Sequence, residues 1–398
     1  MTSVKRLSQG EFVALTAALF AMVAISIDAM LPALPEIAAT MSPDAPNRAQ
    51  LVITSFVFGM GLGTLFVGPL ADAFGRKPVI YAGTALYAMT ALACYFANSL
   101  DTLLVARVLQ GISVAAARVV SMAIMRDLFK GREMAKIMSF VMMVFIMVPA
   151  IAPLMGQAII ALASWHAIFL VYILFAAVII LWFGLRQPET LSKADRRPLD
   201  FGILLAATKE LFTHRIVVIS ILAQTLTMAA LFATLSSMQG IFEQRFDRAA
   251  SFPLWFAFIA LGSASGSIIN SRVVMRLGMR PVITAAYTSV LALTLVLLVL
   301  IASSAMPEML AFPAHILWSI ALFSMMSLTM GNLNALAMEP VGHIAGLAAS
   351  VMTSVATVAS VVLAVPVGLA FNGTAMPLMA GVAVFVACAL ALMRLVRR

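Results

Sequence analysis

Residues 12 to 34 read FVALTAALFAMVAISIDAMLPAL, an apolar run with a single acidic residue, Asp28, inside it. At 1.5 Å per residue, a helix of this length crosses the ~30 Å hydrocarbon core of a bilayer. The whole chain of 398 residues has a similar character, because 63% of its residues are hydrophobic and only 10% are charged. A soluble domain has about 25% charged residues. The sequence therefore predicts an all-α integral membrane protein.

Apolar runs long enough to cross a membrane recur along the whole chain, and no soluble domain fits between them. The twelve predicted spans are 12 to 34, 51 to 70, 79 to 96, 103 to 125, 137 to 162, 168 to 185, 216 to 239, 252 to 269, 282 to 302, 310 to 330, 344 to 370 and 376 to 393. The first run follows Lys5 and Arg6, but it is longer than the apolar region of a secretory signal, so we expect a membrane helix there. Cys94 and Cys388 fall inside spans, where a thiol behaves as a small hydrophobe, so neither a disulfide nor a metal site is expected.

The net charge of +9 is unevenly distributed along the chain. If the N-terminus is cytoplasmic, most of the 25 Lys and Arg residues fall in inner loops and at the two ends. Only Arg48, Arg245 and Arg248 fall in outer loops. This asymmetry is the positive-inside pattern of membrane proteins. It predicts a multi-pass protein with both termini in the cytoplasm, and it assigns the positive charge to membrane topology rather than to nucleic-acid binding.

The two halves of the sequence repeat one another at an offset of 203 residues. The matched positions are Gly59 and Gly262, Gly63 and Gly266, Gly75 and Gly278, and Lys77-Pro78-Val79-Ile80 and Arg280-Pro281-Val282-Ile283. The alternative is a chance coincidence of glycines, but four of the matches are contiguous. Six spans separate the matched segments, so the halves share one orientation, as in parallel-repeat transporters. We predict six-helix bundles at 1–186 and 216–398, joined by a cytoplasmic linker at 187–215 with an interfacial helix from Leu199 to Phe212.

Asp28 is a functional-site hypothesis by default, because a charged Asp at a membrane helix centre costs roughly 2.5 to 3.5 kcal/mol on translocon scales. Counted from Pro35 it lies about 10 Å deep, and Arg107 lies about 9 Å deep in the fourth span, so the two can meet. An arginine nearby favours the carboxylate, whereas burial favours the neutral acid. Hydration or a ligand could then move the proton. The alternatives are a permanently paired structural charge for Asp28 and a helix-orienting role for Arg107.

The remaining candidate residues lie on the predicted walls of a cavity between the halves. Arg118 is eleven residues beyond Arg107 and shares its helix face, but it can also extend to the cytoplasmic headgroups. The positions that match Asp28 and Arg107 in the second half are Leu231 and Leu310, so ionisable chemistry is expected in the first half alone. The candidates for the substrate cavity are Ala24, Met30, Gln110, Arg118, Gln224 and Thr227.

Three motifs carry a family resemblance. The inner loop after the second span reads Gly68-Pro69-Leu70-Ala71-Asp72-Ala73-Phe74-Gly75-Arg76-Lys77-Pro78 and resembles the G-x-L-a-D-r-x-G-r-k signature of the major facilitator superfamily. Arg107-Val108-Leu109-Gln110-Gly111 resembles the R-x-x-Q-G signature of its drug:proton antiporters. The segment from Asp28 to Pro35, together with Arg126-Asp127-Leu128-Phe129, resembles the Bcr/CflA branch, which confers bicyclomycin and chloramphenicol resistance.

The resemblance implies the major facilitator fold and the export of small apolar or amphipathic compounds, by alternating access, across a bacterial inner membrane. Entry of protons would drive this multidrug efflux, with Asp28 as the protonation site and Arg107 as its modulator. At the cytoplasmic interface an ion pair between Asp72 and Arg76 could form and break as a latch, or the basic residues could serve topology alone. The expected cytoplasmic gate comprises Gly68, Asp72, Gly75, Arg76 and Lys77.

Other functions stay open at this point. A transporter of the same fold could take up or pass a metabolite, and an anionic substrate would make Arg107 and Arg118 its ligands. A membrane-embedded enzyme or receptor is disfavoured, since the sequence has no H-E-x-x-H motif, no nucleophile elbow and no paired intramembrane carboxylates. The expected partners are a small-molecule substrate, protons and the lipid bilayer, without nucleic acid. We expect a functional monomer with no cofactor and no metal, and with the proton as coupling ion.

Overall fold

The fold is given by a computed structural model that describes residues 7 to 395. Long helices dominate it, because backbone groups in a hydrocarbon core must bond within their own segment. The helices of the first half are α1 (Gln9–Asp28), α2 (Leu34–Met41), α3 (Leu51–Phe74), α4 (Arg76–Tyr95), α5 (Leu100–Leu128), α6 (Gly131–Leu162) and α7 (Ala167–Arg186). Those of the second half are α8 (Phe201–Thr213), α9 (Arg215–Gly240), α10 (Phe252–Leu277), α11 (Met279–Ala302), α12 (Glu308–Met338), α13 (Ala345–Leu369) and α14 (Met376–Leu395).

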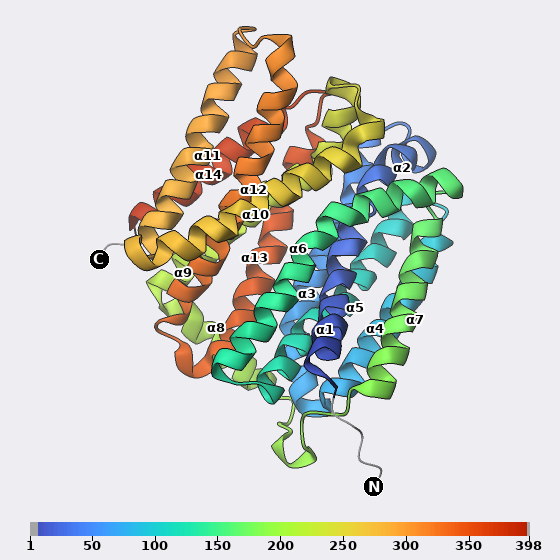
Figure 1. Ribbon diagram of the computed structural model, residues 1–398, viewed down its shortest axis with the longest axis vertical. Helices are drawn as coiled ribbons and strands as arrows, with labels where there is room; N and C mark the ends of the chain where they lie inside the picture. Colours follow the sequence, from blue (N-terminus) through green and yellow to red (C-terminus); the bar gives the residue numbers. More distant parts are fainter. Residues whose placement is uncertain (1–6, 396–398) are drawn as a thin grey trace. The chain divides into compact units, whose positions relative to one another are not determined.

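Twelve of the described helical segments are long and apolar enough to cross a membrane, which confirms the predicted spans. Helix α8 is the short exception, and it lies where the linker sequence predicts a helix. In Figure 1 the helices of the first half run from blue to green, and those of the second half run from yellow-green to red. The protein is therefore an all-helical, multi-span membrane protein.

The contacts between Cα atoms divide the chain into two units. One comprises residues 1–43 and 55–203, and the other comprises residues 44–54 and 204–398. The short segment 44–54 belongs to the second unit, because its 3-10 helix (Pro46–Gln50) packs on α13. There Asn47 donates its side-chain amide to the carbonyl oxygens of Leu369 and Phe371, at 3.0 and 2.7 Å. Helix α3 thus begins in one unit and continues in the other.

The packing inside the first unit is repeated inside the second. Helix α1 packs on α5, α6 and α7, and α9 packs on α12, α13 and α14. Helix α4 packs on α5 and α7, and α11 packs on α12 and α14. The glycines before α4 and α11 also match, because Gly75 has a φ of +104° and Gly278 a φ of +84°. These are backbone conformations that side chains with a Cβ rarely adopt.

Glycines let the helices of the first unit approach closely. A Cβ atom at Gly59 in α3 would lie 2.0 Å from the carbonyl oxygen of Val108 in α5. A Cβ atom at Gly111 in α5 would lie 2.0 Å from the carbonyl oxygen of Phe56 in α3. Small residues at such crossings are typical of membrane helix pairs. The repeated glycines of the second span therefore have a packing role.

The first span is discontinuous, and this corrects the expectation of a single helix over residues 12 to 34. Instead of a single helix to residue 34, α1 ends at Asp28 and a 3-10 turn (Leu31–Ala33) leads into α2. Pro32 and Pro35 lie in the first turns of the next two elements, where a missing N–H is tolerated. The candidate span continues to Met41 instead of ending at Leu34.

Candidate functional site

The site is organised around the end of α1 at Asp28. A helix end leaves its last carbonyl groups without partners in the helix. Here the N–H of Ala29 still reaches the carbonyl oxygen of Ile25 at 3.1 Å, and the N–H of Met30 reaches that of Ile27 at 3.3 Å. The carbonyl oxygen of Ser26, which lies between those of Ile25 and Ile27 along the chain, accepts a hydrogen bond from a neighbouring helix.

That partner is Arg107 of α5, whose side chain is completely buried. Its Nη2 donates to the carbonyl oxygen of Ser26 at 2.8 Å, and its Nη1 donates to Oε1 of Gln110 at 2.7 Å. The guanidinium also lies 4.3 Å from the ring centre of Phe56. A cation is favoured at the C-terminal end of a helix by the helix dipole. Arg107 therefore caps the broken end of α1.

The carboxylate of Asp28 is 5% exposed, and no ion pair joins it to Arg107 in the part of the chain that the structure describes. The arginine instead meets α1 two residues earlier, at Ser26. The structure thus brings the two residues to the same helix end without pairing their charges.

Two tyrosines complete the surroundings of the helix end, and the sequence analysis missed both of them. The hydroxyl of Tyr172 in α7 donates to the carbonyl oxygen of Ile25 at 3.0 Å. The hydroxyl of Tyr87 in α4 lies 2.5 Å from Oγ of Ser26. The two rings are 6.3 Å apart. A buried tyrosine usually has a hydrogen-bond partner, so the tyrosines inside the predicted spans could have indicated these contacts.

Helix α6 closes the same region from a further side. A Cβ atom at Gly156 would lie 2.1 Å from the carbonyl oxygen of Ala29, the residue that follows Asp28. Only glycine therefore allows α6 to lie against the turn after α1. The backbone around Asp28 is consequently held by α4, α5, α6 and α7.

The six residues predicted to line the substrate cavity have different surroundings. Ala24 and Met30 are buried near the end of α1. Gln110 is buried and bound to Arg107, but its Nε2 has no partner among the described residues. Arg118 is exposed although it lies in the same helix as the buried Arg107. Gln110 is thus linked to the end of α1 through its hydrogen bond with Arg107.

The second unit contains its own buried polar positions. Gln224 is buried, and its Nε2 is without a partner among the described residues. Thr227 in α9 lies 2.7 Å from the hydroxyl of Tyr287 in α11, a hydroxyl pair like that of Ser26 and Tyr87. The expectation that ionisable groups are confined to the first half is wrong, because His315 is buried in α12. The comparison of matched positions missed it, since it lies five residues beyond Leu310.

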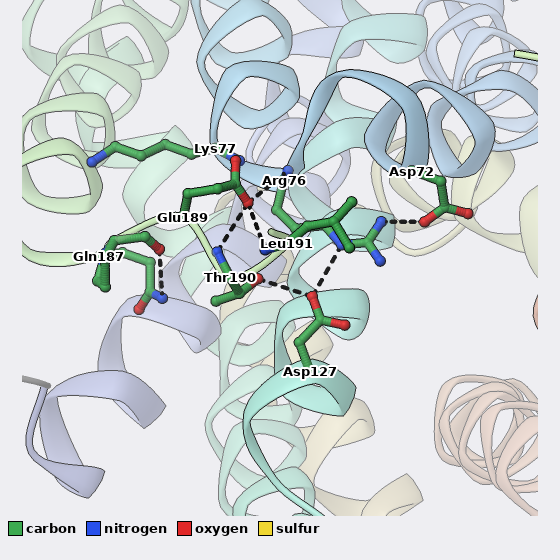
Figure 2. Close-up of polar contacts among 9 residues, drawn as sticks. Asp72, Arg76, Lys77, Asp127, Gln187, Glu189, Thr190 and Leu191 are labelled. Atoms are coloured by element: carbon green, nitrogen blue, oxygen red, sulfur yellow. Dashed lines mark hydrogen bonds and ion pairs between the residues drawn. The ribbon is translucent and has the colours of Figure 1, made fainter. Parts of the chain in front are cut away.

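A cluster of charged residues lies at the start of α4 (Figure 2). The guanidinium of Arg76 forms ion pairs with Asp72 in α3 and, at 3.1 Å, with Asp127 in α5. Thr190, in the segment after α7, donates its hydroxyl to the same Asp127 oxygen atom at 2.9 Å. The ion pair between Asp72 and Arg76 was predicted from the sequence. Asp127 was noted there only as part of a family motif.

Glu189 joins this cluster to the segment after α7 (Figure 2). Its carboxylate accepts hydrogen bonds from the backbone N–H groups of Arg76 and Lys77, each at 3.0 Å. Negative charge is favoured at a helix N-terminus, where N–H groups have no partner in the helix. Gly75 has a φ of +104°, which favours glycine, and a Cβ atom there would also lie 2.6 Å from Oε2 of Glu189, so this side chain would have to shift. The sequence analysis gave Glu189 no role, because nothing in its local pattern shows which helix it meets.

The other predicted gate residues take separate places around this cluster. Lys77 donates its Nζ to the carbonyl oxygen of Gly184 near the end of α7, at 2.8 Å. The backbone N–H of Arg197 donates to the carbonyl oxygen of Asp72 at 3.1 Å. Gly68 lies one turn before Asp72 in α3, next to Pro69. The predicted gate therefore includes four residues joined at the start of α4, with Gly68 on the helix leading to them.

Comparison with known proteins gives matches to transporters. A family model described as Major Facilitator Superfamily matches residues 15–364. The MFS-type transporter YdgK of Bacillus subtilis is 31% identical over 337 residues, which are 82% of this chain and 81% of that protein. A bicyclomycin resistance protein homolog of Haemophilus influenzae is 34% identical over 256 residues, or 63% of each chain. The multidrug resistance protein MdtL of Escherichia coli O157:H7 is 35% identical over 161 residues, or 40% of each chain.

Solved structures share the fold at low sequence identity. A D-xylose-proton symporter is superimposed with a TM-score of 0.75 at 14% identity, covering 96% of this chain and 97% of the other. The human organic anion transporter MFSD10 gives a TM-score of 0.66 at 18% identity, covering 98% and 100%. At these identities the likeness establishes the fold alone.

Proposed function

Because the chain belongs to the major facilitator superfamily, and is therefore a membrane transporter of small molecules rather than an enzyme, we propose that it exports apolar or amphipathic compounds in exchange for protons. The observation that carries this proposal is Asp28, a buried acidic residue at the end of α1, where the helix of the first span breaks. Relatives whose names refer to bicyclomycin and multidrug resistance support the choice of substrate class.

In this proposal Asp28 is the single protonation site. Discontinuous helices in transporters place helix ends at binding sites for substrate and coupling ion. A carboxyl group at such a position gains or loses its proton according to whether water or a cationic ligand reaches it. Arg107 acts as a positioning residue, because it holds the carbonyl of Ser26 and so fixes the end of α1 beside the acid. No further cofactor enters the proposed cycle.

The cluster at the start of α4 serves as the cytoplasmic latch in this mechanism. The ion pairs of Arg76 with Asp72 and Asp127 hold the start of α4 against the ends of α3 and α5. Breaking them as the transporter alternates would expose charges that find water at the membrane surface. The side chain of Asp72 is 47% exposed, so water can replace Arg76 at this carboxylate when the latch opens.

The proposed setting is a bacterial inner membrane, with both termini in the cytoplasm and a monomer as the functional unit. The bias of Lys and Arg towards the inner loops supports this orientation. One proton that enters down a potential of about 100 mV supplies about 2.3 kcal/mol. This is sufficient for export of one neutral molecule against a gradient of roughly fiftyfold, since about 1.4 kcal/mol corresponds to a factor of ten.

Transport in proteoliposomes with an imposed pH gradient tests the proposal. Asp28→Asn should abolish pH-driven transport of a test drug such as chloramphenicol, while leaving the protein folded and able to bind the drug. The matched control is Glu11→Gln in the same helix, because Glu11 is an acid held by Arg186 at 2.7 Å and should be irrelevant to coupling. Full pH-driven transport by Asp28→Asn would exclude Asp28 as the coupling site. Transport that is equally fast without a pH gradient would favour a facilitator instead.

A further inference from the structure

A mostly apolar groove of about 290 Å³ lies between α10, α11 and α12, within the second unit. Its α10 side is a row of residues spaced four apart, Ile269, Val273 and Leu277. On α11 the lining extends from Val282 to Val290, and Val290 lies eleven residues from the start of that helix, or about 16 Å at the helical rise. The groove therefore extends over about half of the ~30 Å hydrocarbon core, which is the depth of one leaflet.

Helix α10 is held against α12, and its last turns are otherwise exposed. A Cβ atom at Gly266 would lie 2.8 Å from the carbonyl oxygen of Ser324, so the two helices approach closely there. One turn further, Asn332 donates its side-chain amide to Oδ1 of Asn270 at 2.8 Å. Beyond these contacts Met275 is 87% exposed. The groove is therefore open on the side of α10 that α12 does not cover.

Two arginines border this groove at the end of α10. Arg272 and Arg276 line a recess together with Val273 and Leu277, and these two apolar residues also line the groove. The arginines are four residues apart, so they are neighbours on one side of the helix. Both are exposed, and the ion pairs among the described residues include neither of them. Positive charge and an apolar groove therefore adjoin at one helix end.

The internal repeat shows that this charge belongs to the second half alone. At the offset of 203 residues, Arg272 and Arg276 match the uncharged Pro69 and Ala73. The acid of the first copy, Asp72, is matched by a methionine, and α10 contains no acidic residue. The second copy thus has two additional cations and no acid to pair with them. Membrane topology requires basic residues in an inner loop, but it does not require two of them on one side of a helix beside a groove.

We propose that this groove binds a phospholipid with a net negative headgroup, such as phosphatidylglycerol. One acyl chain lies along the apolar lining, and the phosphate group lies at Arg272 and Arg276. A guanidinium group presents paired N–H donors that match the oxygen atoms of a phosphate. Basic pockets between membrane helices are suited to acidic headgroups in the same way. The site is independent of the proposed antiport, because it uses no residue of the first unit.

Native mass spectrometry of the full-length protein in detergent tests this site. The protein is titrated with phosphatidylglycerol and with phosphatidylethanolamine of the same acyl chains. The wild type should bind phosphatidylglycerol about tenfold more tightly, as expected for two basic residues near an acidic headgroup. The double variant Arg272→Gln/Arg276→Gln should lose this preference. Equal affinities of the wild type for the two lipids, or a preference that survives in the double variant, would overturn the proposal.

The matched control for charge is the double variant Arg126→Gln/Arg132→Gln. It removes the same number of charges at exposed positions of the first unit, so it should keep the preference for phosphatidylglycerol. An equal loss of preference in both double variants would show that net charge alone attracts the lipid, and would reject a site at α10.

A second set of variants locates the acyl chain. Ala285→Trp fills the groove from α11 and should weaken the binding of phosphatidylglycerol, and Ser289→Trp replaces it if the first variant does not fold. Thr288→Trp is the control, because it is exposed on the same helix but does not line the groove. Unchanged lipid binding by a folded groove-filling variant would reject the site. A protein dimer in lipid-free detergent that Ala285→Trp abolishes would assign the groove to a second copy of the chain instead.

Discussion

Arg107 donates a hydrogen bond from Nη2 to the carbonyl oxygen of Ser26, two residues before Asp28, at 2.8 Å. The arginine thus binds the backbone of the broken helix while the neighbouring carboxylate stays outside its hydrogen bonds. The charge that binds the backbone and the carboxylate proposed as the protonation site are thus two different groups at one helix end. Each can be tested by its own substitution.

Arg107→Lys should destabilise the protein although it keeps the positive charge. One ammonium group cannot reproduce the planar fork that bonds Ser26 and Gln110 together. A buried acceptor left unpaired costs about 1–3 kcal/mol, so the melting temperature in detergent should fall measurably. Arg126→Lys, at an exposed position near the end of the same helix, is the control. Equal melting temperatures of the two variants would show that Arg107 does not cap α1.

The hydrogen bond between Ser26 and Tyr87 should be measurable in a double-mutant cycle. Ser26→Ala and Tyr87→Phe, singly and together, should give a coupling energy of about 0.5 to 1.5 kcal/mol in the free energy of unfolding. The parallel cycle with Thr227→Ala and Tyr287→Phe should give a similar value, because the second unit contains the same kind of pair at 2.7 Å. A coupling near zero in both cycles would contradict the paired geometry.

Gly75→Ala should destabilise the protein more than Gly278→Ala. Both glycines have positive φ, so both substitutions introduce backbone strain of about 1–3 kcal/mol. At Gly75 the new Cβ would in addition lie 2.6 Å from the carboxylate of Glu189, whereas at Gly278 the nearest atom is 4.0 Å away in Pro281. The difference between the two free energies of unfolding should shrink when Glu189→Ala is added. A difference that persists without the Glu189 side chain would count against this explanation.

Gly156→Ala should reduce both stability and pH-driven transport. Its Cβ would lie 2.1 Å from the carbonyl oxygen of Ala29, so α6 must move away from the turn beside Asp28. Gly331→Ala is the matched control, since no atom lies within 4 Å of its added Cβ and alanine is the better helix former by about 1 kcal/mol. Melting curves and proteoliposome transport of the two variants check this. Unchanged transport by Gly156→Ala would mean that the turn after Asp28 tolerates displacement.

The twelve spans and the repeat could be predicted because they depend on properties that residues carry locally. Apolar runs of sufficient length become helices in a membrane wherever they occur, and Gly75 and Gly278 mark matching helix starts by their position alone. The break after Asp28 was less visible. Pro32 and Pro35 signal a discontinuity, but tolerance of proline in membrane helices allows a continuous helix as well.

The contacts that side chains make with neighbouring helices could not be predicted from the sequence. Helical depth places Arg107 near Asp28, but which acceptor the guanidinium reaches depends on side-chain rotamers and on the carbonyl groups freed at the helix break. Glu189 illustrates the same limit, because its partners are two backbone N–H groups more than 100 residues earlier. His315 was visible in the sequence, yet only the structure shows that its ring nitrogens have no hydrogen-bond partner among the described residues.

The hydrogen bonds that Glu189 and Arg197 make to α3 and α4 decide where this chain can be divided. An N-terminal half ending at Arg186 would contain all six long helices of the first unit, but the start of α4 would lack the carboxylate that caps it. Glu189 follows α7 in the sequence, so the ribosome synthesises this residue after all six helices. Two separately synthesised halves should therefore reassemble well when the cut falls beyond Arg197, and poorly when it falls directly after α7.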